Sequence, residues 1–180
     1  MSPDVDLLPK LETLGAGALR HVNGPLLSHL KGTRDLLRKW GNPEALCNAG
    51  LYHAVYGTAG FEPALLDVKD RGAGAALLGE DAERIVYVFA ACDREYFYKQ
   101  LLKPEEPAYR DRFTGAIYRL NPEAFRDICE LTLANELEIL AAAPGPNRSC
   151  GRHLDRVLGR MTAHASQGAR EDYRRLIERP

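Results

Sequence analysis

Long apolar runs, a charge imbalance and paired cysteines are all missing from this sequence of 180 residues. Because no run of about 18 apolar residues occurs, we expect no membrane-spanning helix. Lys and Arg number 24 and Asp and Glu number 25, so the formal net charge is −1. The basic excess typical of nucleic-acid-binding proteins is therefore absent. These properties predict that neither a membrane nor a nucleic acid is a partner.

The cysteines are widely spaced and form neither a CxxC pair nor the spacing of a zinc finger. They are Cys47, Cys92, Cys129 and Cys150. This pattern predicts reduced thiols rather than disulfides. Residues 1–6 contain two aspartates and no Lys or Arg, whereas a secretory signal begins with basic residues. We therefore expect a cytoplasmic protein.

Apolar residues recur at helical spacing along most of the chain. We expect helices over 3–19, 26–40, 43–57, 63–68, 71–78, 80–91, 93–102 and 121–143, and two more within 151–180. A strand is the alternative for 80–91, and a small hairpin is expected near 112–119. The pattern predicts an all-α fold in a single domain, 1–180. Residues 151–180 form a C-terminal helical extension.

Two of the histidines are spaced so that they should meet. His29 lies in the helix expected over 26–40, and His53 lies near the end of the next helix. The short turn between them makes these helices antiparallel or steeply crossed neighbours. Each histidine is about 12 residues from the turn, or roughly 18 Å at 1.5 Å per residue, so the imidazoles should be level. Paired imidazoles can bind a metal ion or transfer protons near neutral pH.

The segments around these histidines carry a family resemblance. They read Gly24-Pro25-Leu26-Leu27-Ser28-His29 and Ala49-Gly50-Leu51-Tyr52-His53, and Leu78–Val86 follows as a glycine-led helix. This pattern resembles the HD-domain superfamily of metal-dependent phosphohydrolases, and is most similar to the (p)ppGpp hydrolase domains of RelA/SpoT proteins. The resemblance covers about 20–142 and implies an HD-like helical bundle with His29 and His53 at metal-ligand positions.

The sequence departs from the HD pattern at its acidic positions. Ala54 stands where the superfamily has Asp, and Gly57 and Thr58 replace the Glu-Asp pair of the RelA/SpoT branch. Asn135 falls where the family places its last metal-binding aspartate. Two imidazoles and an amide lack the anionic ligands that Mn²⁺ and Mg²⁺ prefer. The site is therefore predicted to be remodelled, and His53–Thr58 also resembles an HD-like group of unknown function.

A carboxylate could reach the histidines from Asp93, which follows the helix expected over 80–91. With His29 and His53 it would complete the set of two histidines and one carboxylate found in mononuclear Fe(II) centres. Some proteins with the HD fold are iron oxygenases. The alternative is that Asp93 caps the helix that begins near Arg94.

Other polar residues complete the predicted site. Tyr56 lies three residues after His53 and would share its helix face. Glu136 and Glu138, beside Asn135, are either a second source of negative charge or part of a solvated helix face.

Arg94 and Arg112 suit bidentate contacts with an anionic group, with surface salt bridges as the alternative. The catalytic candidates are His29, His53, Tyr56, Arg94 and Asn135, the substrate-binding candidates are His21, Thr58 and Arg112, and the metal-ligand candidates are His29, His53 and Asp93.

The sequence thus predicts an enzyme that acts on a small polar metabolite through His29 and His53. These residues would hold a divalent metal, Fe or Mn, or act as an acid–base pair without one. Two alternatives stay open: a catalytically degenerate HD domain that binds a ligand or partner, and a mononuclear iron oxygenase. The expected partner is a small molecule, and the sequence does not specify an oligomeric state.

Overall fold

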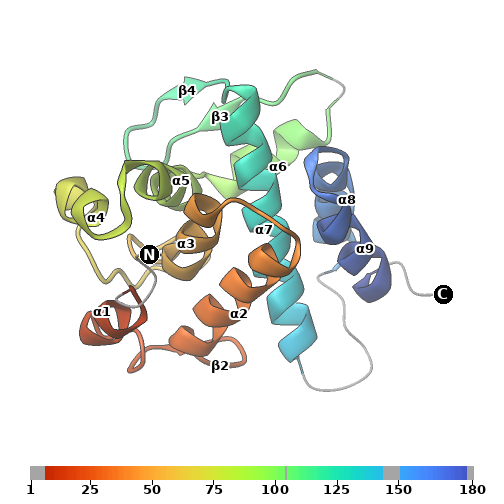
Figure 1. Ribbon diagram of the computed structural model, residues 1–180. Coiled ribbons are helices and arrows are strands. Elements are labelled where there is room, and N and C mark those ends of the chain that lie inside the picture. The colour runs from red at the N-terminus through yellow and green to blue at the C-terminus, as the bar shows by residue number, and fades with distance from the viewer. Residues whose placement is uncertain (1–6, 104, 144–150, 178–180) are drawn as a thin grey trace.

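The computed structural model describes residues 7–103, 105–143 and 151–177. α-Helices make up most of this part of the chain, and the strands form two short hairpins (Figure 1). The fold is therefore all-α, as the apolar periodicity predicted. Within the described residues, no helix combines the length and the apolar character needed to cross a bilayer.

The elements follow one another along the chain, and the longest connection between them, 53–67, joins α3 to η2. The α-helices are α1 (Leu7–Thr13), α2 (Leu26–Lys39), α3 (Glu44–Tyr52), α4 (Arg71–Leu78), α5 (Glu80–Ala91), α6 (Arg94–Leu101), α7 (Pro122–Ala142), α8 (Arg152–Met161) and α9 (Gln167–Leu176). Two short 3₁₀ helices are η2 (Val68–Asp70) and η3 (Thr162–His164). The antiparallel hairpins pair β1 (Arg20–His21) with β2 (Gly24–Pro25), and β3 (Tyr109–Arg110) with β4 (Ile117–Tyr118).

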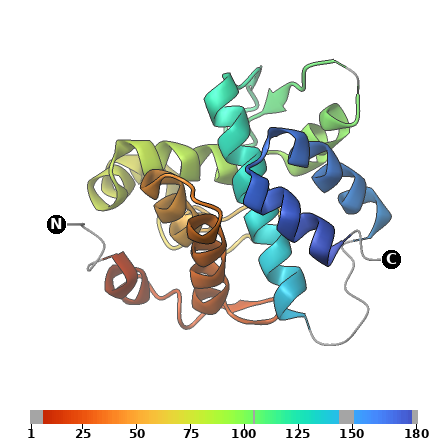
Figure 2. The ribbon, with the colours of Figure 1, turned by 45° about the vertical axis from the view of Figure 1, so that its right-hand side comes forward.

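The long helix α7 is the central element. It contacts α2, α3 and α5 on one side and α8 and α9 on the other (Figures 1 and 2). Every residue from Ile128 to Leu137 is buried, as expected for a helix that is surrounded by others. Its start is fixed by Asn121, whose side chain accepts a hydrogen bond of 2.8 Å from the backbone N–H of Ala124.

Two clusters of buried apolar side chains lie beside α7. The first includes Leu11, Leu26, Leu51, Tyr52 and Val86 and joins α1, α2, α3 and α5. The second includes Leu37, Phe97, Leu133, Leu158 and Tyr173 and joins α2, α6 and α7 to the C-terminal helices. A polar contact adds to the second cluster: the indole N–H of Trp40, at the end of α2, donates to Asp172 on α9 at 2.9 Å. The C-terminal helices therefore share a core with α7.

Glycines allow α2 and α3 to pack closely. Gly41 has a φ of +78° just beyond the end of α2, a conformation that favours glycine. At Gly50, a Cβ atom would lie 2.5 Å from Cδ1 of Leu37. The missing side chain thus lets α3 approach α2, and this approach places His29 and His53 at the same level.

Several element boundaries differ from the sequence-based expectations. The helix expected over 63–68 does not form, and the backbone N–H groups of Leu65 and Leu66 instead donate to the carbonyl of Val55 at 2.8 and 3.0 Å. α1 ends at Thr13 instead of residue 19, and Gly15 with a φ of +94° follows it.

The turn regions differ as well. Asn42, in the turn between α2 and α3, donates to the carbonyl of Leu37 at 3.2 Å and to Glu130 at 2.8 Å. The hairpin expected near 112–119 spans 109–118. The β1–β2 hairpin was not expected, and Asn23 at its tip ties it to α7 by donating to the carbonyl of Ile139 at 2.8 Å.

The described cysteines are buried free thiols, as predicted: Cys47, Cys92 and Cys129. Burial raises the pKa of Cys92 and of Cys129 to about 12. Such thiols are inert because the thiolate is the reactive form. Cys150 lies outside the described residues.

Candidate functional site

His29 on α2 and His53, directly after α3, meet in the interior of the protein. Their Nε2 atoms are 3.3 Å apart, and the two rings are nearly perpendicular, at 88°. The exposed fractions of the two residues are only 5% and 2%. The imidazoles therefore face each other and not bulk solvent, which is the arrangement that the helix lengths predicted.

Asn135 on α7 brings a third polar atom to this pair. Its Oδ1 atom lies 3.1 Å from Nε2 of His29. Its amide nitrogen donates to Glu136 at 3.0 Å. Because the nitrogen is held by a carboxylate, the oxygen is the atom that faces the histidines.

Hydrogen bonds to the outer nitrogens set the tautomers of both rings. Nδ1 of His53 lies 2.8 Å from the carbonyl oxygen of Gly50, and Nδ1 of His29 contacts the carboxylate of Glu138. Both partners are acceptors, so each Nδ1 carries a hydrogen, and in a neutral ring Nε2 then presents a lone pair. Burial and the neighbouring His29 hold the pKa of His53 well below its usual value, which favours the neutral ring.

Three acceptor atoms thus converge. A proton on one Nε2 atom, or a metal ion between the three atoms, would relieve their mutual repulsion. Two nitrogens bound to one ion at about 2.0–2.1 Å lie roughly 2.8–3.4 Å apart when the angle at the ion is about 90–110°. The observed 3.3 Å between His29 and His53 falls in this range. Two imidazoles and an amide oxygen suit Fe(II) or Zn²⁺ better than Mn²⁺.

His21, from β1, covers the outer face of His29. Their ring centroids are 4.2 Å apart with an interplanar angle of 15°. Phe61 packs edge-on against His21 with a centroid distance of 5.4 Å. Burial and the neighbouring His29 lower the pKa of His21. His21 therefore acts as a neutral, stacked cover that separates His29 from solvent.

Two small cavities adjoin the imidazoles. The larger has a volume of about 130 Å³ and is lined by His21, Val22, His53, Ala54, Thr58, Gly60, Phe61, Arg94, Asn135, Glu136 and Ile139. The smaller, of about 60 Å³, lies beside His29 and Glu138. With about 30 Å³ per water molecule, the larger cavity accommodates a small ligand or one end of a larger one.

Arg94 and Glu136 supply the charges of the larger cavity. Nη1 of Arg94 lies 3.8 Å from Oε1 of Glu136, and the guanidinium lies 5.0 Å from the ring centroid of Phe89. A Cβ atom at Gly60 would lie 3.3 Å from Nη1 of Arg94, so glycine leaves room for this side chain. Thr58 accepts a hydrogen bond of 3.3 Å from the N–H of Gly60 and retains its hydroxyl hydrogen for donation.

The structure does not bring Asp93 to the histidines. One carboxylate oxygen accepts from the backbone N–H of Tyr96 at 3.0 Å, and the other accepts from Arg110 at 2.6 and 2.9 Å. Asp93 therefore caps α6, the alternative that its position before Arg94 had left open. Within residues 7–103, 105–143 and 151–177, no three His, Cys, Asp or Glu side chains are grouped so that they could hold a metal ion.

Two further candidates also lie elsewhere. The Tyr56 hydroxyl donates to Glu83 at 3.2 Å and points toward α5. Because α3 ends at Tyr52, helical spacing no longer relates Tyr56 to the face of His53. Arg112 donates through Nε to the carbonyl of Ala90 at 2.7 Å and is absent from the lining of both cavities beside the imidazoles.

Glu138, expected either as a source of negative charge or as part of a solvated helix face, contacts Nδ1 of His29 with its carboxylate and so orients that ring. Its spacing of three residues from Asn135 was the available signal, since such residues share a helix face. Gly32 makes room for it, because a Cβ atom there would lie 2.8 Å from Cγ of Glu138. Glu138 and Gly32 therefore belong to the candidate site.

Comparisons with known proteins add a family match. Residues 10–94, slightly less than half of the chain, match the family described as Domain of unknown function (DUF6817). The matching segment contains His21, His29, His53 and Arg94 and ends before α7. No curated protein and no solved structure matches the chain.

Proposed function

We propose that this chain is an HD-like enzyme that acts on a small polar metabolite with a divalent metal ion bound at His29 and His53. The observation that carries the proposal is the convergence of three acceptor atoms, each oriented by a hydrogen bond on its far side. Such outer partners are typical of metal sites, where they fix the tautomer and direction of the ligands. The resemblance of the sequence to HD domains supports the same ligand positions.

A divalent ion held by His29, His53 and Asn135 would supply a Lewis acid that polarises a substrate oxygen or lowers the pKa of a bound water. These three ligands are neutral, so the protein must balance the charge from nearby. The carboxylates of Glu136 and Glu138, which contact Asn135 and His29, supply that balance.

The remaining residues of the cavity bind and orient the substrate. Arg94 is positioned to hold a carboxylate or phosphate group, because its planar guanidinium pairs with both. Thr58 donates a hydrogen bond to the same ligand. Glu136, the carboxylate on the cavity wall, accepts a proton from the reacting group. The volume of about 130 Å³ limits the part of the substrate that enters to a few heavy atoms.

A second candidate function follows from the missing carboxylate ligand. If a proton and not a metal ion lies between His29 and His53, the site is a degenerate HD domain that binds a small anion through Arg94. The iron oxygenase alternative required Asp93 beside the two imidazoles, and its carboxylate is engaged by Arg110 and the start of α6. Among the described residues, the features that support an iron oxygenase are therefore the same ones that support any metal site at His29 and His53.

Metal analysis distinguishes the metalloenzyme from the degenerate HD domain. The protein is purified without a metal-affinity tag, incubated anaerobically with Fe(II), Zn²⁺ or Mn²⁺, desalted and analysed by mass spectrometry. We expect about one ion per chain, lost in His29→Gln and in His53→Gln. His164→Gln, at an exposed histidine on η3, is the matched control and should retain the ion. Protein that stays free of metal under all three conditions would overturn the metalloenzyme proposal.

Turnover is then tested with the metal-loaded protein and a panel of small phosphate esters and carboxylates. Arg94→Gln should raise KM for an anionic substrate, whereas Glu136→Gln should lower kcat. Equal kinetics in wild type and both variants would contradict the roles assigned to these residues.

A further inference from the structure

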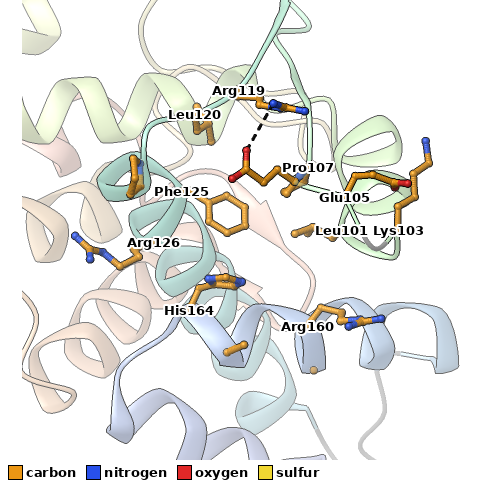
Figure 3. A pocket seen from close by; sticks show the side chains of 14 residues that line it. Leu101, Lys103, Glu105, Pro107, Arg119, Leu120, Phe125, Arg126, Arg160 and His164 are labelled. Atoms are coloured by element: carbon orange, nitrogen blue, oxygen red, sulfur yellow. Dashed lines mark ion pairs between the residues drawn. The ribbon is translucent and has the colours of Figure 1, made fainter.

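A further cavity lies away from the histidines. It has a volume of about 790 Å³ and is enclosed by the end of α6, the segment after β4, the start of α7, and α8 with η3 (Figure 3). It shares no lining residue with the cavities beside the imidazoles. Arg126 in its wall and Asn135 are separated by about 14 Å along α7, at 1.5 Å per residue.

The floor of this groove is apolar and aromatic. Phe125 lies in the middle of it, and the ring of His164 meets Phe125 edge-on with a centroid distance of 4.8 Å (Figure 3). Phe97 packs edge-on against Phe125, at a centroid distance of 6.2 Å. Leu101 and Leu120 extend the apolar surface. Such a floor suits the flat or apolar body of a ligand.

The rim of the groove is basic. Lys103, Arg119, Arg126 and Arg160 face two acidic residues, Glu105 and Glu106, which leaves a net formal charge of +2. Glu106 is already paired with Arg119 at 3.6 Å. Among the residues that the structure describes, Arg126 and Arg160 have no ion-pair partner, and Figure 3 shows them on either side of His164.

We propose that this groove is a binding site for a small organic anion. The apolar body of the ligand covers Phe125, and its carboxylate, phosphate or sulfonate group is attracted by the basic rim, where Arg126 and Arg160 lie on opposite sides of His164. The volume of about 790 Å³ is within the range of about 300–1,000 Å³ that is usual for small-molecule sites. The excess of positive charge selects an anion over a neutral ligand of the same shape.

A matched pair of probes tests both parts of the proposal. The probe is 8-anilinonaphthalene-1-sulfonate, an aromatic anion whose fluorescence rises when it binds, and the comparison is N-phenyl-1-naphthylamine, which has the same rings without the sulfonate. We expect one sulfonate probe per chain, with an affinity that falls as salt is added. The neutral probe should bind more weakly and without dependence on salt.

Variants then locate the site. Arg126→Gln and Arg160→Gln should each weaken the sulfonate probe about threefold, and the double variant about tenfold, because both arginines are exposed. The neutral probe should be unaffected, and Arg174→Gln on α9, outside the groove, should bind both probes as wild type does. Far-UV circular dichroism confirms folding. Several sulfonate molecules per chain, or binding that is equal in the double variant, would overturn the proposal.

Discussion

Nε2 of His29 lies 3.3 Å from Nε2 of His53, although 24 residues separate them in the chain. Gly50 contributes to this proximity in two ways. Its lack of a side chain lets α3 approach Leu37 on α2, and its carbonyl accepts the hydrogen bond that turns His53 toward His29. The site thus depends on close helix packing as much as on the histidines themselves.

Glu138 should control metal affinity through His29. Glu138→Ala removes the acceptor that orients Nδ1, and loss of such a partner typically weakens metal binding about 10–100-fold. Glu138→Gln retains an acceptor without the charge and should have a smaller effect. Competition with a chromogenic chelator measures both. Glu123→Gln, an exposed residue in the first turn of the same helix, is the control, and wild-type affinity in Glu138→Ala would contradict this role.

Gly32→Ala should weaken metal binding with little change in stability. Alanine normally stabilises a helix interior by about 0.5–1 kcal/mol relative to glycine. Here the new Cβ atom would lie 2.8 Å from Cγ of Glu138, so the carboxylate must leave His29. Gly72→Ala on α4 is the control, because a Cβ atom there meets nothing within 4 Å. Urea unfolding and chelator competition are compared for both variants, and unchanged metal affinity in Gly32→Ala would contradict the prediction.

The fold class could be predicted from the sequence because the residues that cap a helix and form its apolar stripe lie close together in the chain. The apolar stripe and the capping pair Asn121-Pro122 are sufficient to place α7 to within a residue of its observed start. The β1–β2 hairpin was not predictable, because its position depends on a contact between Asn23 and the carbonyl of Ile139, 116 residues away. The HD-like arrangement stays a prediction, since no solved structure matches the chain.

The candidate site was only partly predictable, for a related reason. The pairing of His29 and His53 follows from helix length and a short turn, which the sequence shows. Tyr56 was misplaced because α3 ends four residues before it, a boundary that the pattern over 43–57 does not reveal. The role of Glu138 depends on the rotation of α7 about its axis, which tertiary packing sets.

Glu83 should be a major determinant of stability. It is 4% exposed and accepts from Arg71 at 2.6 and 2.7 Å and from Tyr56 at 3.2 Å. Glu83→Ala leaves these donors without a carboxylate and should lower the free energy of unfolding by about 2–3 kcal/mol, measured by urea denaturation. Arg84→Ala breaks an exposed pair with Asp81 and should cost less than about 1 kcal/mol. Similar losses in the two variants would contradict the prediction.

Tyr56→Phe tests whether Tyr56 serves the stability of the hydrogen-bonded group around Glu83 or the candidate metal site. The variant loses the hydrogen bond to Glu83, and removing such a bond to a charged group costs about 1.5–3 kcal/mol. Metal content should remain that of wild type, because the hydroxyl bonds to Glu83 and not to a residue of the histidine pair. Loss of metal in a folded Tyr56→Phe protein would restore Tyr56 as a site residue.

Asp172 should make the protein sensitive to acid. Burial raises the pKa of its carboxyl, but hydrogen bonds from Lys39, Trp40 and Arg175 outweigh burial and lower the pKa from 3.8 to about 2. Between pH 4 and 2 the unfolded chain therefore binds more protons at this residue than the folded chain. The stabilisation, about 1–2 kcal/mol after allowance for exposure of the basic partners, is complete above pH 4 and is lost as the pH falls to about 2.

Asp172→Asn isolates this contribution. The variant should be about 1–2 kcal/mol less stable than wild type at pH 7, and the difference should shrink as the pH falls from 4 to 2, because wild-type Asp172 then becomes neutral as well. Urea unfolding across this pH range measures the difference directly. Glu171→Gln, its exposed neighbour on α9, should leave the pH dependence of wild type unchanged. A difference of equal size at pH 2.5 and pH 7 would show that shape, and not the charge of Asp172, anchors α9 to α2.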